Sequence, residues 1–295
     1  MHKRKNQPHI VTMSLSDNIA GFCSGLGASL KSVVKMAAQS RRPSVKRIAL
    51  PGEKLIIMGN GPSLADNIRN DLGKLSTART LAVNFAANAD EFTLLRPDFY
   101  LLADPHFFDG RESDPNVGKL FKRINEAVDW EMTLFIPTSR TVSSLGITNP
   151  RVKVERFNLV GVEGFDWLTA RAYSSGAGMP RPRNVLIPAI MVGMLMGFKD
   201  IYIIGADHSW IKTLDVNERN EVVSVQPHFY KDNNEEHSRV TAVYKNVRLH
   251  EILMSFHVAF KAYHAIASYA ATRGVNIYNS TPASYIDAFP RCPLP

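Results

Sequence analysis

Short runs of apolar residues alternate with longer segments of helical periodicity from Pro51 to the end of the chain. This alternation is typical of a parallel sheet with helices on both faces, because each buried strand is followed by a crossover helix. The pattern therefore predicts an α/β protein with a Rossmann-like, mostly parallel sheet. The predicted strands are residues 55–59, 81–84, 99–103, 133–136, 152–157, 201–205 and 276–278.

The same pattern predicts the helices that cover the sheet. Helix starts are expected near Ser63, Asn116 and Asn184. Residues 185–198 are apolar nearly all round, as in a helix buried against a sheet, and Gly197 is expected to end that helix. A long helix is expected from residue 238 to about residue 272, with Gly274 in its C-cap region.

Residues 206–236, between the sixth strand and the long helix, are polar and rich in His and Asn. A connection of this length inside a compact domain is usually a functional lid or a binding loop. We therefore expect a main domain over residues 51–295 with a lid at about 206–236, preceded by an N-terminal arm over residues 1–50.

The net charge of +8 lies in the arm. Residues 1–50 contain nine of the 35 basic residues and one of the 27 acidic residues, so the remaining chain, with 26 of each, is neutral. Residues 19–38 can form an amphipathic helix. Its apolar side would contain Phe22, Leu26, Leu30, Val33 and Val34. A basic amphipathic arm suits an anionic membrane surface; the alternatives are a packing arm or a flexible leader followed by a linker at residues 40–43.

Other features of the sequence bear on partners and compartment. The arm contains one aromatic residue, Phe22, and no recognised nucleic-acid motif, so we expect no nucleic-acid partner. The sequence has no apolar run long enough to span a bilayer and no apolar region of a signal peptide. Cys23 and Cys292 form no CxxC motif, which favours free thiols. We expect a cytoplasmic protein, with the arm as a peripheral contact to the inner face of the cell membrane.

The sharpest motif is the segment from Leu55 to Leu64, in which an apolar strand runs directly into the turn Gly-Asn-Gly-Pro-Ser. Gly59 and Gly61 are expected to adopt dihedrals closed to other residues and to let a ligand approach the backbone. Ser63 is expected to cap the next helix, whose free N–H groups would favour a phosphate. A purely structural glycine turn is the alternative.

Polar residues follow three more of the predicted strands. Asn84 ends the second strand, Asp104 follows the third, and Asp207 and His208 follow the sixth. Open α/β sheets bind ligands at the C-terminal ends of their strands, so Asn84 could bond a base or ribose and Asp207 could accept ribose hydroxyls. Either residue could instead cap a helix. Asp104 and Asp207 together could hold Mg²⁺ near phosphates.

Two histidines in the lid are candidates for a general base. A transferase that activates a sugar hydroxyl needs a base with a pKa near neutrality, which histidine supplies. His237 is the first candidate and His228 the second. Surface histidines without a role are the alternative explanation.

These segments resemble the bacterial family-42 sialyltransferases and their superfamily, which includes flagellin nonulosonate transferases and 6-hydroxymethylpterin diphosphokinase-like proteins. The resemblance covers residues 54–290 and is concentrated in short motifs. It rests on the GNGPSL turn, on Asn84, on Asp104-Pro-His-Phe-Phe, on the run from Gly197 to Asp207, on His237-Ser238 and on the segment from Asn276 to Ser284. The Arg-x-x-Ser-Gly of the family is matched loosely by Arg181-Pro-Arg183-Asn184, and its tyrosines after the Gly-Ile-Asp run are replaced by His208, Ser209 and Trp210.

The resemblance implies an inverting glycosyltransferase that moves a sialic-acid-like or other acidic sugar from a CMP-sugar to a glycan or a lipid-linked glycan. It implies His237 as the base, with His228 as the second candidate. Arg181, Arg183 or Lys231 could offset the charge of the leaving phosphate. The implied nucleotide-binding residues are Gly59, Asn60, Gly61, Pro62, Ser63, Asn84, Asp104, Asn184, Gly205, Asp207, His208 and Ser280. No cofactor and no metal are expected, and a homo-oligomer is expected from the family.

Two other functions stay open at this point. One is a Mg²⁺-dependent pterin diphosphokinase or another nucleotide-dependent transferase, with the metal on Asp104 and Asp207. The other is a non-catalytic nucleotide- or glycan-binding protein of polysaccharide assembly.

Overall fold

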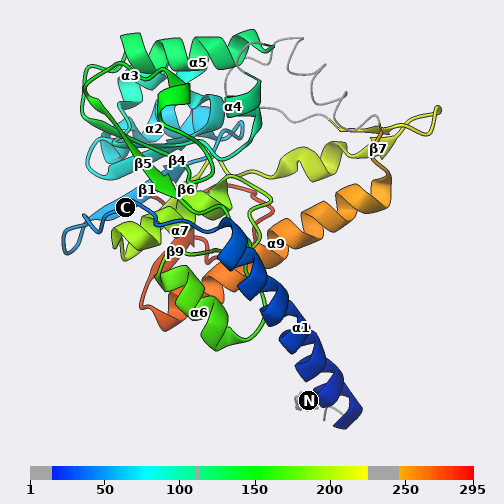
Figure 1. Ribbon diagram of the computed structural model, residues 1–295. Helices are drawn as coiled ribbons and strands as arrows, with labels where there is room; N and C mark the ends of the chain where they lie inside the picture. The colour runs from blue at the N-terminus through cyan, green and yellow to red at the C-terminus, as the bar shows by residue number, and fades with distance from the viewer. Residues whose placement is uncertain (1–14, 111–112, 225–245) are drawn as a thin grey trace, which may run out of the picture.

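A seven-stranded parallel sheet lies at the centre of the protein, in the strand order β5-β4-β3-β2-β1-β6-β9 (Figure 1). The computed structural model describes residues 15–110, 113–224 and 246–295. The strands are β1 Lys54–Met58, β2 Arg79–Val83, β3 Phe99–Leu101, β4 Met132–Pro137, β5 Val152–Phe157, β6 Asp200–Ile204 and β9 Asn276–Asn279. All seven predicted strands are confirmed, each within two residues of its expected ends, and so is the α/β, Rossmann-like fold class.

Helices cover both faces of this sheet, and each face has its own hydrophobic core (Figure 1). Side chains of β1 alternate between the two cores: Leu55 and Ile57 enter one, Ile56 and Met58 the other. This alternation follows from the period of two in a strand and explains why β1 is apolar throughout. The first core is covered by α6 Asp166–Ser174, α7 Leu186–Met196 and α9 Leu249–Thr272. The second is covered by α2 Leu64–Leu75, η1 Asn84–Asn88, α3 Phe92–Leu95, α4 His106–Asp109 and α5 Pro115–Glu126.

The strand order reverses between β1 and β6. β1 pairs with β2 on one side and with β6 on the other, in parallel on both sides. The chain proceeds outward from β1 through β2, β3 and β4 to β5, and then returns to form β6 beside β1. The helices that follow β1 and β6, α2 and α9, therefore cover opposite faces of the sheet, and a crevice is expected at the C-terminal ends of these two strands.

The predicted helices are confirmed in part. α2 follows Ser63, α5 begins at Pro115 next to the predicted start, and α7 ends at Gly197, which has φ 99°. The long helix does not extend over residues 246–248, contrary to the prediction. α9 starts at Leu249, because the Glu251 carboxylate accepts a hydrogen bond of 2.8 Å from the backbone N–H of Arg248 and so caps the helix there.

The predicted lid is described only over residues 206–224. This part holds the short helix η3 Ser209–Thr213 and an antiparallel pair, β7 Asp215–Val216 with β8 Val222–Val223. The sequence pattern did not predict these elements, nor α6 and the short helix η2 Ser143–Leu145. Each is a short element with weak periodicity.

The N-terminal arm contains the predicted helix, α1 Leu15–Gln39, which extends away from the body (Figure 1). It contacts the body mainly through the side that carries Ser29 and Ser32, and at the edge of the apolar side the ring of Phe22 lies 5.5 Å from that of Phe165. Ser29 and Ser32 are buried against the main domain, whereas Phe22 and Leu30 are 60% and 66% exposed. Among the described residues, no helix combines the length and the apolar character needed to cross a bilayer.

Candidate functional site

The crevice between β1 and β6 contains a cavity of about 140 Å³. It lies between the C-terminal ends of β1, β2 and β6 and the residues that precede α7. The cavity brings together nine of the twelve predicted nucleotide-binding residues: Gly59, Asn60, Gly61, Pro62, Asn84, Asn184, Gly205, Asp207 and His208. Ser63, Asp104 and Ser280 are not part of its lining.

The two glycines that end β1 and β6 are required by space. A Cβ on Gly59 would lie 2.4 Å from the carbonyl oxygen of Gly205, and a Cβ on Gly205 would lie 2.5 Å from the carbonyl oxygen of Gly59. Gly205 also has φ +62°, whereas Gly59 and Gly61 have no positive φ. The prediction that Gly59 and Gly61 adopt dihedrals closed to other residues is therefore wrong. They allow two backbones to meet, because the pairing of β1 and β6 continues into the turn.

Three backbone N–H groups of the Gly-Asn-Gly-Pro-Ser turn, those of Gly59, Gly61 and Ser63, have partners inside the protein. Gly59 donates to the carbonyl of Ile204 and Gly61 to the carbonyl of Gly205, each at 2.8 Å. Pro62 has no N–H group. The N–H group of Ser63 faces a carboxylate oxygen of Asp207 at 3.4 Å. These three residues therefore do not offer a free N–H group to a phosphate in this structure.

The Asp207 carboxylate occupies the place where an anion at the start of α2 was expected. Its Oδ2 accepts a hydrogen bond of 2.8 Å from the hydroxyl of Ser63. The same oxygen would lie 2.0 Å from a Cβ on Gly61. Ser63 precedes α2 as predicted, but its side chain makes no capping hydrogen bond, because the hydroxyl is used by Asp207. An acid from β6 thus replaces the expected ligand at the positive end of α2.

Asn84 has a strained backbone and an unpaired side-chain oxygen. Its φ is 51°, in the left-handed region, and the hydroxyl of Tyr100 donates to its carbonyl. Asn84 Oδ1 is buried and has no hydrogen-bond partner among the residues that the structure describes. Backbone strain of this kind costs about 1 kcal/mol or more and concentrates at functional sites. A buried acceptor without a partner, on a residue that lines the cavity, is what a bound donor would satisfy.

His208 lines the same cavity, and its backbone is also in the left-handed region, with φ 52°. Its Nε2 lies 2.9 Å from the hydroxyl of Tyr263. That hydroxyl donates to Asn184 Oδ1 at 3.2 Å. The oxygen of Asn184 is identified by the N–H group of Leu186, which donates to it at 2.9 Å.

These hydrogen bonds indicate which ring nitrogen of His208 carries the proton. The hydroxyl of Tyr263 has one proton, which goes to Asn184, so the hydroxyl can only accept from His208. Nε2 of His208 therefore carries the proton and Nδ1 is an acceptor. Burial lowers the pKa of His208 to about 4, so the ring stays neutral at neutral pH. Burial also raises the pKa of Tyr263, so its hydroxyl stays protonated.

The cavity is therefore rich in acceptors. Three of them come from separate strand ends: Oδ1 of Asn84 after β2, and the Asp207 carboxylate and Nδ1 of His208 after β6. No lysine or arginine lines the cavity in the part of the chain that the structure describes. Such a site suits a neutral ligand group with several O–H or N–H donors.

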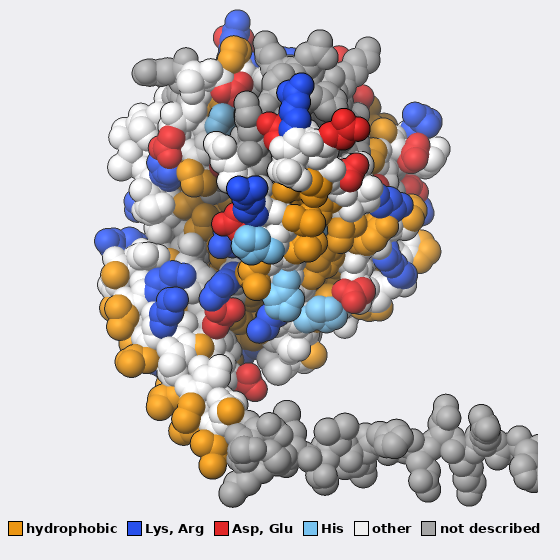
Figure 2. Space-filling model, turned by 90° about the vertical axis from the view of Figure 1, so that its right-hand side faces the viewer, with side chains coloured by type: hydrophobic (Ala, Val, Ile, Leu, Met, Phe, Trp, Pro, Cys, Tyr) orange, Lys and Arg blue, Asp and Glu red, His pale blue; other side chains and the backbone are white. Residues whose placement is uncertain are grey.

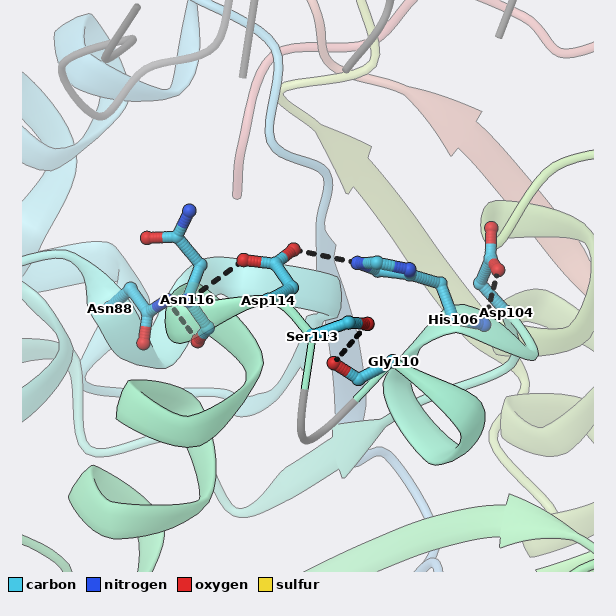
Figure 3. A network of polar contacts seen from close by, with 7 residues as sticks. All are labelled: Asn88, Asp104, His106, Gly110, Ser113, Asp114 and Asn116. Atoms are coloured by element: carbon cyan, nitrogen blue, oxygen red, sulfur yellow. Dashed lines mark hydrogen bonds and ion pairs between the residues drawn. The ribbon is translucent and has the colours of Figure 1, made fainter. Parts of the chain in front are cut away.

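A second polar network follows β3, and the sequence reasoning missed its main pair. Nε2 of His106 lies 2.7 Å from the carboxylate of Asp114, whose other oxygen accepts from the N–H group of Asn116 and so caps α5 (Figure 3). Asp104 is exposed and accepts a hydrogen bond from the N–H group of His106. The signal in the sequence was a histidine and a carboxylate eight residues apart, on either side of a short helix.

The remaining predicted residues lie apart from the cavity or outside the described chain. His228 and His237 fall outside the described residues. Arg183 is exposed, and Arg181 forms an ion pair of 2.7 Å with Glu163. The Ser280 hydroxyl, at the end of β9, is buried without a partner among the described residues.

The Mg²⁺ alternative needs Asp104 and Asp207 in one site. The structure places Asp207 on the cavity and Asp104 outside its lining, bonded to its own turn. In the described parts of the chain, no three His, Cys, Asp or Glu side chains form a group that could hold a metal ion.

Comparison with known proteins gives one structural likeness. No family model and no curated protein matches the sequence. Among solved structures, the chain is similar to the Maf glycosyltransferase from Magnetospirillum magneticum AMB-1, with 13% identity and a TM-score of 0.49. The similarity covers 94% of this chain and 40% of that protein, so the chain spans less than half of its length.

Proposed function

We propose that the protein is a nucleotide-dependent glycosyltransferase and that the cavity at the β1–β6 crevice binds a hydroxyl-rich part of its sugar-nucleotide donor. The observation that carries the proposal is the group of three acceptors from Asn84, Asp207 and His208 around one cavity. A ribose or a sugar presents O–H donors to such a group. The crevice is also where open α/β sheets bind their ligands.

The size and charge of the cavity define which part of the donor it takes. About 140 Å³ is less than the roughly 300–1,000 Å³ of a complete small-molecule site, so it holds one ring of the donor. With a carboxylate and no cation in the described lining, that ring is the uncharged ribose or the base. The phosphate then lies outside the cavity, where Arg183, next to Asn184, is the nearest arginine in sequence.

The resemblance to family-42 sialyltransferases supports a finer proposal, in which the donor is a CMP-linked acidic sugar. His237 would remove the proton from an acceptor hydroxyl as its oxygen bonds the anomeric carbon. The bond from that carbon to the phosphate oxygen breaks at the same time, its electron pair leaves with CMP, and the configuration inverts. Arg183 would offset the charge of the leaving phosphate. His228 remains a second candidate for the base.

Among the described residues, His106 is an alternative to His237 as the general base. His106 is paired with a carboxylate, as bases in many active sites are, and its ring is 6.4 Å from that of Phe85, the residue after Asn84. Separate replacement of His237 and His106 by alanine distinguishes the two. Replacement of the residue that acts as the base should lower turnover by about a hundredfold or more and leave the affinity for CMP unchanged.

Ligand-dependent unfolding tests the donor. CMP, UDP, GDP, ADP and ATP should be compared in a thermal-shift panel with the full chain. We expect CMP to stabilise the protein, by about 2.7 kcal/mol at a concentration a hundred times its Kd. The shift should be lost in Asp207→Asn. Stabilisation by a different nucleotide would overturn the CMP donor, and no response to any of the five would overturn the nucleotide site itself.

A further inference from the structure

The helix α1 presents its apolar side to solvent. Its large apolar side chains between residues 19 and 34 are 45% to 66% exposed: Ile19, Phe22, Leu26, Leu30, Val33 and Val34. At 100° per residue these positions form one stripe about 120° wide along the helix. Figure 2 shows this stripe as a line of hydrophobic side chains on the free edge of the helix. A helix of a globular protein normally buries such a stripe.

The side of α1 that adjoins the stripe at Phe22 fixes this orientation. Ser29 Oγ accepts a hydrogen bond of 2.9 Å from the N–H group of Phe165. Ser32 Oγ donates to the carbonyl of Glu163 at 2.7 Å and accepts from its N–H group at 2.9 Å. A Cβ on Gly164 would lie 2.7 Å from the Cα of Ser29, so the helix and this loop are in backbone contact. With its polar side held in this way, the helix cannot turn its apolar side inward.

The charged residues that follow the start of the stripe in sequence have one sign. Residues 19–50 contain no Asp or Glu and six basic residues: Lys31, Lys35, Arg41, Arg42, Lys46 and Arg47. The carboxylate of Glu163, on the loop beneath the helix, is paired with Arg181 at 2.7 Å. Pairing of two such arms would bring cations against cations, whereas a surface of anionic lipid attracts all six.

We propose that α1 is an interfacial helix that attaches the protein to a bilayer containing anionic lipid. The apolar stripe enters the boundary between headgroups and acyl chains, and the basic residues around it contact the headgroups. The clamp by Ser29 and Ser32 holds the body at a constant orientation to the membrane. This inference is independent of the activity proposed above.

Vesicle flotation of the full chain tests the proposal. One set of vesicles contains phosphatidylcholine alone, and a second contains phosphatidylcholine and phosphatidylglycerol in equal parts. We expect flotation with the second set only, and weaker flotation as salt is raised. The double variant Leu26→Glu, Leu30→Glu should reduce binding by about tenfold or more. Because both residues are exposed, an unchanged unfolding temperature will show that the variant is folded.

A matched control separates the apolar stripe from charge alone. Ser24→Glu with Gln39→Glu adds the same two negative charges to exposed positions of α1 outside the stripe, and should keep most of the binding. Equal loss in both double variants would mean that only charge matters and would overturn the interfacial helix. Absence of vesicle binding would also overturn it, as would a concentration-dependent dimer that Leu26→Glu, Leu30→Glu dissolves, since the stripe would then belong to a second copy.

Discussion

In both the crevice between β1 and β6 and the attachment of α1, a glycine lets two backbone segments come into contact. In the crevice, Gly59 and Gly205 let two backbones touch. At the arm, Gly164 does the same beneath Ser29. The difference is in what each contact leaves unpaired. The crevice leaves a polar atom, Asn84 Oδ1, without a partner among the described residues, whereas the arm pairs its serines and leaves its apolar side chains exposed.

This contrast shows how each region identifies its partner. A buried acceptor costs free energy until a donor reaches it, so the crevice is suited to a ligand with O–H groups. Exposed apolar area has a favourable transfer free energy to any surface that removes it from water, so the arm is suited to a bilayer. In both regions the informative group is the one for which the fold supplies no partner.

The largest expected effect is the difference in stability between alanine variants of two glycines: Gly205, at the end of β6, and Gly164, in the loop that contacts the arm. Gly205→Ala places a methyl group 2.5 Å from a carbonyl oxygen at φ +62°, so we expect a loss of about 3 kcal/mol or more in the free energy of unfolding. Gly164→Ala also meets backbone, at Ser29, and has φ +125°, so it should release α1 and lower the free energy of unfolding of the body by less than Gly205→Ala. Urea unfolding and limited proteolysis within α1 measure the two results.

Gly73→Ala is the control for this pair. Gly73 is in α2, and a Cβ there would have no atom within 4 Å. Alanine should therefore stabilise slightly, by helix propensity. If Gly205→Ala unfolds like Gly73→Ala, the two strand ends are not in the contact described, and the proposed geometry of the crevice is wrong.

The second effect concerns the neutral histidine of the crevice. The pKa of His208 is about 4 in the folded protein, against 6.5 for the free side chain. Between these values the unfolded state binds the additional proton, so stability falls as the pH is lowered from about 6.5 to about 4. The full loss is about 3 kcal/mol. His208→Gln cannot take up this proton, so its stability should change less over the same pH range.

Urea unfolding at several pH values measures this difference, and the arm supplies the comparison. The contacts of Ser29 and Ser32 contain no titrating group, so their loss in Ser32→Ala should leave the pH dependence of wild type intact. Identical pH profiles for wild type and His208→Gln would show that His208 is not buried as a neutral ring, and the tautomer derived from Tyr263 would be wrong.

The parts of this molecule that follow from periodicity could be predicted from the sequence. Apolar runs such as residues 55–58 have few other solutions in a soluble chain, so all seven strands were found. Residue types also located the crevice, because Asn84 and Asp207 end strands that meet at one edge. The periodicity of α1 predicted its helix and its apolar side correctly.

What could not be predicted depends on contacts between distant segments. Nothing near Ser63 in the sequence shows that its hydroxyl and its N–H group face the Asp207 carboxylate, since 144 residues separate the two. The Asn184–Tyr263–His208 chain joins three elements in the same way. The sequence left open whether α1 packs on the body through its apolar side, because the side that is buried depends on contacts with the loop at Glu163.

The smallest effect tests whether the strain at Asn84 is functional. Asn84→Gly relieves a φ of 51° and removes the unpaired Oδ1, so stability should rise by about 0.5–1 kcal/mol while donor affinity falls about tenfold.

Asn220→Gly makes the same replacement at φ 57° in the turn between β7 and β8, away from the cavity lining. It should gain similar stability and keep donor affinity. Titration of the donor into both variants measures this. Equal affinities would mean that Asn84 only shapes the turn after β2. The crevice would then contain no unpaired acceptor that binds the donor, which is the feature that distinguishes it from the arm.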